Sequence, residues 1–162
     1  IPRPAHLIIH TLFPLQLGNY IERKTTMSKF QETMEWLLKA HNLLEVFQTQ
    51  DHFHVRFEQN SLMPLVIERH GDLISVAHYF EQEGDLIQDP EVEFHFPSWF
   101  PTAITQAWLG RREKFIQHQD VTFIDTKFHN EVTSFTSLWA RNIRAQHWDQ
   151  ATIKRSSVEV EA

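Results

Sequence analysis

The sequence predicts a single α+β domain, in which an antiparallel meander of about five to six strands is flanked by an N-terminal and a C-terminal helix. Two observations support this prediction. Apolar residues recur at helical spacing near the two ends, in residues 28–44 and 128–147, and at every second position in several runs between them. The connections between those runs are short, and short connections favour antiparallel neighbours.

The first helix is predicted over residues 28–44, where apolar side chains recur at three- and four-residue spacing and Ser28 is a favourable N-cap. The last helix is predicted over residues 128–147. Trp139 belongs to its apolar stripe, and Asn142 is expected to tie the helix end to the sheet.

Between the helices, short runs of alternating apolar and polar residues predict strands, and His70-Gly71-Asp72 predicts a tight turn. Gly84 and Pro90 predict a loop before the fourth strand, because proline lacks a backbone donor. The third strand is expected to place His78 and Glu81 on opposite faces. The predicted strands are residues 53–57, 64–69, 73–82, 91–96, 102–109 and 121–124.

Three segments are expected along the chain. Residues 1–26 show no clear period and precede Met27, so they are interpreted either as a translated leader that is not native or as an N-terminal extension. Residues 27–150 form the single domain, and residues 151–162 are predicted to be a flexible tail.

Composition excludes several classes of protein. The chain has no cysteine, which removes disulfides and thiolate metal sites and favours a cytoplasmic location. Its formal net charge of −6 argues against direct nucleic-acid binding. No apolar run reaches the roughly 20 residues needed to span a bilayer. Glycine-rich phosphate loops and the nucleophile elbow are absent from the sequence.

A cluster of carboxylates is the most informative feature of the sequence. No lysine or arginine occurs between His70 and Gly110, while Arg111 and Arg112 follow at once. An uncompensated acidic edge would attract a protein partner with a basic surface. Two other outcomes are that the acidic residues cap turns and are solvated, or that the arginines cover them. The candidate partner-binding residues are Glu81, Glu83, Asp85, Asp89, Glu91 and Glu93.

Three separated stretches resemble the signature of an uncharacterised bacterial family. They follow M-P-L-x-x-E at residues 63–68, S-x-x-H-Y-x-E-Q-x-G-D-L-x-x-D-P-E-x-E at residues 75–93, and F-x-x-x-W-x-R-N-x-x-A-Q at residues 135–146. Similar domains are carried on plasmids, phages and integrated elements. The resemblance therefore implies a fold and a mobile-element setting, without catalytic residues. Its structural motif positions include Tyr79, Gly84, Pro90, Trp139 and Asn142.

Two functions remain open from the sequence. The first is a non-catalytic binding or accessory module of a mobile genetic element, which engages a protein partner through its acidic edge. The alternative is a metal-dependent hydrolase or nuclease with a His/Glu/Asp site around residues 78–91. No cofactor is expected for the first, and a divalent metal for the second. The catalytic candidates are His78 and Glu81; the metal candidates are His78, Asp85 and Asp89, with His52 and His54 as a weaker pair.

Overall fold

The protein has the predicted α+β fold, with an antiparallel sheet and helices at both ends. The computed structural model describes residues 26–118 and 121–157. The leader hypothesis for residues 1–26 therefore falls almost wholly outside the described residues. The elements are α2 (Lys29–Ala40), α3 (Leu44–Thr49), β1 (His52–Glu58), β2 (Leu65–His70), β3 (Leu73–Gln82), β4 (Asp85–His95), β5 (Phe100–Gln106), β6 (Gly110–Glu113), β7 (Phe115–His118), β8 (Val121–Ile124), α4 (Thr126–Ala145), the 3-10 turn η1 (Trp148–Gln150) and β9 (Thr152–Ser157).

The main sheet has more strands than the sequence predicts. Its seven strands lie in the order β6-β5-β4-β3-β2-β1-β9, and β7 and β8 form a separate hairpin. All of these neighbours are antiparallel. Five consecutive hairpin connections therefore join β1 to β6, as the meander prediction requires.

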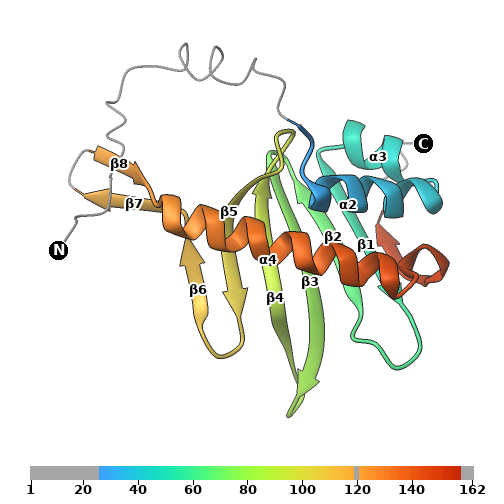
Figure 1. Cartoon of the computed structure of the whole chain (residues 1–162). Coiled ribbons are helices and arrows are strands. Elements are labelled where there is room, and N and C mark those ends of the chain that lie inside the picture. Colours follow the sequence, from blue (N-terminus) through green and yellow to red (C-terminus); the bar gives the residue numbers. More distant parts are fainter. Residues whose placement is uncertain (1–25, 119–120, 158–162) are drawn as a thin grey trace.

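The helices cover one face of the sheet and leave the other open. Figure 1 shows α4 crossing the strands, with α2 beside it toward the β1 side. Alternate strand residues consequently differ in burial: in β1, Phe53, Val55 and Phe57 are buried, whereas His54 and Arg56 are partly exposed. The same alternation continues in β4, where Val92 is buried and Glu93 is only half-buried on the open face.

The N-terminal helix begins as predicted but ends earlier. The Ser28 hydroxyl accepts a hydrogen bond from the Gln31 backbone N–H at 3.1 Å, which confirms the N-cap. The helix stops at Ala40, because Asn42 adopts a left-handed conformation with φ of 59°. The short helix α3 follows, before the first predicted strand at residue 53.

The fourth strand is longer than predicted, and the expected loop is instead part of a hairpin. β4 begins at Asp85, and the turn consists of Glu83 and Gly84, with φ of 54° and 90°. Two positive φ values are typical of tight hairpin turns. Pro90 is accommodated because the β3–β4 register shifts at this point, and a bulge is a position where a strand tolerates proline.

The chain also forms a strand where a flexible tail was expected. Residues Thr152–Ser157 pair with β1 and form one edge of the sheet. Residues 158–162 lie outside the described residues.

The core is rich in aromatic rings and lies between the helices and the sheet. Phe30 of α2 stacks on Phe94 of β4 with ring centroids 5.1 Å apart, and it also contacts Trp139 of α4. Trp148, in the turn after α4, is fully buried. Among the helices of the described residues, none is long and apolar enough to cross a membrane.

Candidate functional site

A β-bulge between β3 and β4 decides which polar side chains lie together. The register shifts between Ala77 and Tyr79, so Asp89 and Pro90 together face the single residue His78. One extra residue in a strand reverses the alternation of side chains beyond it. Asp89 consequently lies on the helix side of the sheet, separate from the acidic residues that follow it in the sequence.

His78 lies on that helix side, as predicted, and is held in one orientation. Its Nδ1 is 3.1 Å from the backbone oxygen of Met63 and 3.2 Å from that of Pro64. Carbonyl oxygens only accept, so Nδ1 carries the proton. The ring contacts Trp139 and Trp148, with centroids 5.5 and 5.6 Å away. Burial lowers the pKa of His78, although both backbone hydrogen bonds act in the opposite direction.

His78 lines a pocket of about 280 Å³ between α4 and the strands, which we call the helix-side pocket. Residues from all three of the stretches quoted in the sequence analysis contribute to it. Only one charged side chain, Asp89, lines it among the described residues. Its apolar wall consists of Met63, Pro90, Phe135, Leu138 and Trp139, and its polar wall of His78, Asp89, Asn142 and Gln146.

The groups on the polar wall keep hydrogen-bonding capacity for a ligand. Asp89 uses Oδ1 to accept a hydrogen bond from the Ala107 backbone N–H at 3.3 Å. Gln146 uses its side-chain oxygen to accept from the Trp148 indole at 3.0 Å. The Trp139 side chain is 6% exposed, and its indole N–H has no acceptor among the described residues.

The tip of the β3–β4 hairpin carries the exposed part of the acidic cluster. Glu81, Glu83 and Asp85 are exposed, and none forms an ion pair within the described residues. Figure 1 shows this hairpin extending beyond its neighbours at the lower edge of the sheet. These three carboxylates are the part of the predicted edge that is both exposed and, in the described part of the chain, without an ion pair.

Glu91 and Glu93 lie on the open face of the sheet and are paired there. Ser75 donates a hydrogen bond to Glu91 at 2.7 Å. Arg111 binds both carboxylate oxygens of Glu93, at 2.6 and 2.8 Å, and this pairing raises the pKa of Arg111. Arg112 instead pairs with Glu131 at 3.1 Å. Arg111 therefore covers one carboxylate of the predicted edge and leaves the hairpin tip uncovered.

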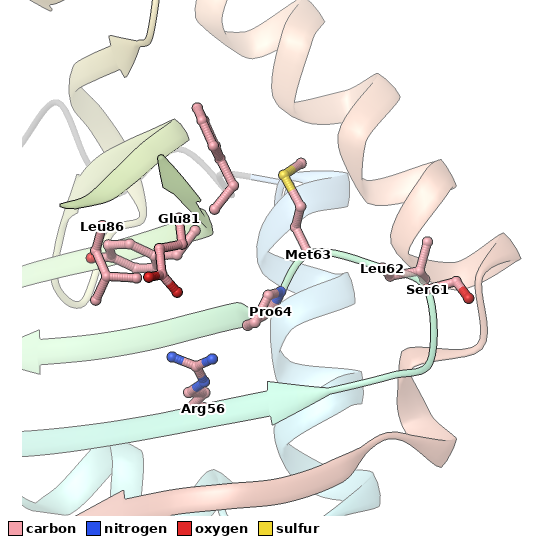
Figure 2. Close-up of a pocket in the computed structure, with 9 residues that line it drawn as sticks. Arg56, Ser61, Leu62, Met63, Pro64, Glu81 and Leu86 are labelled. Atoms are coloured by element: carbon pink, nitrogen blue, oxygen red, sulfur yellow. The ribbon is translucent and has the colours of Figure 1, made fainter. Parts of the chain in front are cut away.

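A second pocket, of about 360 Å³, lies on the open face beside the hairpin tip. Figure 2 shows Arg56 on one side of it and Glu81 and Leu86 on the other. Tyr79 also lines it and receives a hydrogen bond from Gln88. Burial raises the pKa of Tyr79, and the neighbouring carboxylates act in the same direction.

The candidate metal ligands do not assemble into one site. His78 lines the helix-side pocket, whereas Glu81 lines the pocket on the open face. His54 pairs with Glu68 at 3.4 Å, while His52 contacts His70. In residues 26–118 and 121–157, no three histidine, aspartate or glutamate side chains come close enough to hold a metal ion.

Comparison with known proteins shows the family to which the chain belongs. Residues 32–148 match the model of a domain of unknown function, DUF6908. The chain belongs to this family. Searches among curated proteins and among solved structures found no significant match. The DUF6908 segment contains both pockets and the acidic hairpin tip, whereas β9 follows it.

The DUF6908 domain also exposes apolar side chains that were not predicted from the sequence as functional residues. The connections β1–β2, β3–β4 and β5–β6 lie at one end of the meander, which we call the hairpin end (Figure 1). Trp108 is 95% exposed there, Leu109 65% and Leu86 64%, and Met63 is exposed as well. The sequence analysis placed Trp108 and Leu109 inside the predicted strand 102–109, whereas β5 ends at Gln106 and both residues lie in the β5–β6 connection. The available signal was their position directly before Gly110, a residue that favours a turn.

Proposed function

We propose that this DUF6908 domain is a non-catalytic binding module that engages a basic surface of a protein partner through its hairpin end. The observation that carries the proposal is the coincidence of two features at one end of the sheet. Glu81, Glu83 and Asp85 supply negative charge without a recorded ion pair, and Trp108 and Leu86 supply exposed apolar area.

These two features have different physical roles in association. Exposed carboxylates steer a basic partner and fix its orientation, and their effect is screened by salt. Exposed tryptophan and leucine side chains supply the apolar burial that holds a complex together, and tryptophan is enriched among residues that dominate binding energy. Trp108 and the adjacent Leu109 are exposed together, which supports a docking role more than a single exposed apolar side chain would.

The proposed recognition surface contains fewer carboxylates than the acidic edge predicted from the sequence. Glu91 and Glu93 belong to the open face and are engaged by Ser75 and Arg111. Asp89 belongs to the helix-side pocket. The recognition surface proposed here therefore contains three of the six predicted carboxylates.

The setting of this interaction is also part of the proposal. The sequence resembles bacterial domains carried on plasmids, phages and integrated elements, and we expect a cytoplasmic partner in such a setting. The alternative, a metal-dependent hydrolase or nuclease, requires His78 and Glu81 to act together. That alternative gains no support, because the two side chains line different pockets.

The experiment is capture of partners from the native host by the full chain, followed by identification of the captured proteins. A tip variant carries Glu81→Gln, Glu83→Gln and Asp85→Asn. A control variant with the same change in charge carries Glu32→Gln, Glu45→Gln and Asp72→Asn, at exposed positions away from the hairpin end. We expect a protein with a basic surface that the wild type and the control retain and the tip variant loses. Equal capture by all three chains would refute the proposal.

A further inference from the structure

Two residues that line the helix-side pocket, His78 and Asp89, have acceptor capacity that the described part of the chain does not use. Because Nδ1 of His78 donates to two carbonyl oxygens, Nε2 of the neutral ring is left with a lone pair. No hydrogen bond to Nε2 occurs within the described residues. The Asp89 carboxylate accepts one backbone hydrogen bond, from Ala107, and has further acceptor capacity. A ligand that satisfies both groups must therefore donate hydrogen bonds.

The remaining walls suit a long apolar stem and a cationic head. Met63 and Leu138 are exposed apolar side chains at the pocket, and Phe135 and Trp139 add aromatic rings. Aromatic faces attract cations, and the stems of lysine and arginine cover apolar surface while their heads stay polar. Asp89 adds a negative charge, and in the part of the chain that the structure describes no lysine or arginine lines the pocket.

We propose that the helix-side pocket binds a basic side chain, an alkyl-guanidinium or alkyl-ammonium group, with its head between Asp89 and His78 and its stem against Met63 and Leu138. Lysine and arginine carry donors and no acceptors, which matches the acceptor capacity of His78 and Asp89. The Trp139 indole N–H is itself a donor and takes no part in this pairing. A planar guanidinium can also stack on an aromatic ring. The pocket is thus the place where a residue of the proposed basic partner inserts, and in this respect the inference rests on the proposed function.

The pocket adjoins the surface proposed for partner binding. Met63 lines both the helix-side pocket and the pocket on the open face. Asp89 accepts its hydrogen bond from Ala107, the first residue of the β5–β6 connection, which is followed by the exposed Trp108. One partner segment could therefore contact the hairpin end and place a basic side chain in the pocket.

The test is an NMR titration of the full chain with three probes: N-acetyl-arginine amide, N-acetyl-lysine amide and N-acetyl-citrulline amide. The indole N–H signals of isotope-labelled tryptophan report binding. Citrulline has nearly the shape of arginine without its charge. We expect arginine, lysine or both to shift the Trp139 signal saturably and citrulline to leave it unchanged; the two basic probes decide which head fits. Equal shifts with citrulline, or no shift with either basic probe, would overturn the inference.

Two variants locate the effect. Asp89→Asn removes the charge but keeps an oxygen that can accept the hydrogen bond from Ala107, so the variant should fold. Its affinity for the basic probe should be about tenfold lower than that of the wild type. Glu45→Gln, which removes one charge at an exposed position of α3 away from the pocket, should change that affinity less than about twofold. Equal affinity in Asp89→Asn and wild type would contradict the inference.

The outcomes of the two experiments are separable. If the basic probes do not bind while the tip variant still loses the partner, the pocket inference fails and the proposed function stands. If a basic probe shifts Trp139 while the tip variant retains every captured protein, the proposed function fails and the pocket remains a cation site.

Discussion

His78 illustrates how single residues are specified in this domain. Its position on β3 places it on the helix face, as the strand alternation predicts, but its chemistry depends on distant residues. Met63 and Pro64 fix its proton on Nδ1, and Trp139 and Trp148 pack against its ring. Local pattern predicts the face of a strand residue, whereas its tautomer and pKa depend on tertiary contacts that no local pattern contains.

The first prediction concerns the pH dependence of stability. Burial lowers the pKa of His78 below its ordinary 6.5 in the folded state. As pH falls below 6.5, the unfolded chain binds a proton that the folded chain does not, so the free energy of unfolding decreases. His78→Asn retains a donor for the backbone carbonyls and removes the titration. Urea unfolding between pH 8 and pH 5 should show a shallower acid loss in this variant; parallel curves would contradict this assignment.

The second prediction concerns Ser75 and Glu91 on the open face. Their hydrogen bond of 2.7 Å is part-buried, so Ser75→Ala leaves a carboxylate oxygen without this donor. We expect a loss of about 1 kcal/mol in the free energy of unfolding. Chemical denaturation measures it, with Ser134→Ala at an exposed position of α4 as a comparison. Equal stability of Ser75→Ala and wild type would show that water replaces the serine.

At the scale of elements, the β3–β4 hairpin shows what the sequence could predict and what it could not. Alternation predicted β3 with its observed ends, because one of its faces is buried in the core. The same reasoning predicted too short a fourth strand, because Pro90 argues against a regular strand. The bulge removes that conflict, and it also moves Asp89 to the helix side. The helix-side pocket was therefore not predictable from strand periodicity.

The third prediction concerns the turn of this hairpin. Gly84 has φ of 90°, a conformation that strains any residue with a Cβ, although open space surrounds the position. We expect Gly84→Ala to lower the free energy of unfolding by about 1 kcal/mol. Gln82→Ala, in an exposed part of β3, serves as the comparison in the same thermal or urea experiment. An unchanged stability for Gly84→Ala would mean that the turn adopts another conformation.

β9 was missed for a different reason. Residues Thr152–Ser157 lack a clear alternation, and only the free edge of β1 makes them a strand. The fourth prediction is that a chain ending at Ala151 exposes the backbone groups of β1 to water. Amide hydrogen exchange in β1 should then be faster than in the full chain. A chain that lacks only residues 158–162 should match the full chain, and unchanged exchange without β9 would contradict its role.

At the scale of the whole molecule, the meander gathers features that lie far apart in the sequence. Alternate connections of an antiparallel meander share one end of the sheet, so the connections that contain Met63 and Trp108 and the hairpin that carries Leu86 lie at the same end (Figure 1). The predicted strands placed the β1–β2 and β3–β4 connections at one end, but they continued the fifth strand through Trp108 and so missed the third connection. The pairing of Glu93 with Arg111 was not predictable from the sequence, because it requires the β4–β5–β6 registers.

The central claim is that charge and apolar area at the hairpin end bind a basic partner, and the affinity of the captured partner at two salt concentrations tests it most directly. With wild type and the charge-matched control, we expect equal affinity that falls as salt increases from about 50 to 300 mM. The tip variant should bind at least tenfold more weakly at low salt, and Trp108→Ser should weaken binding at both concentrations. Equal affinity of the tip variant and the control at low salt would contradict the account.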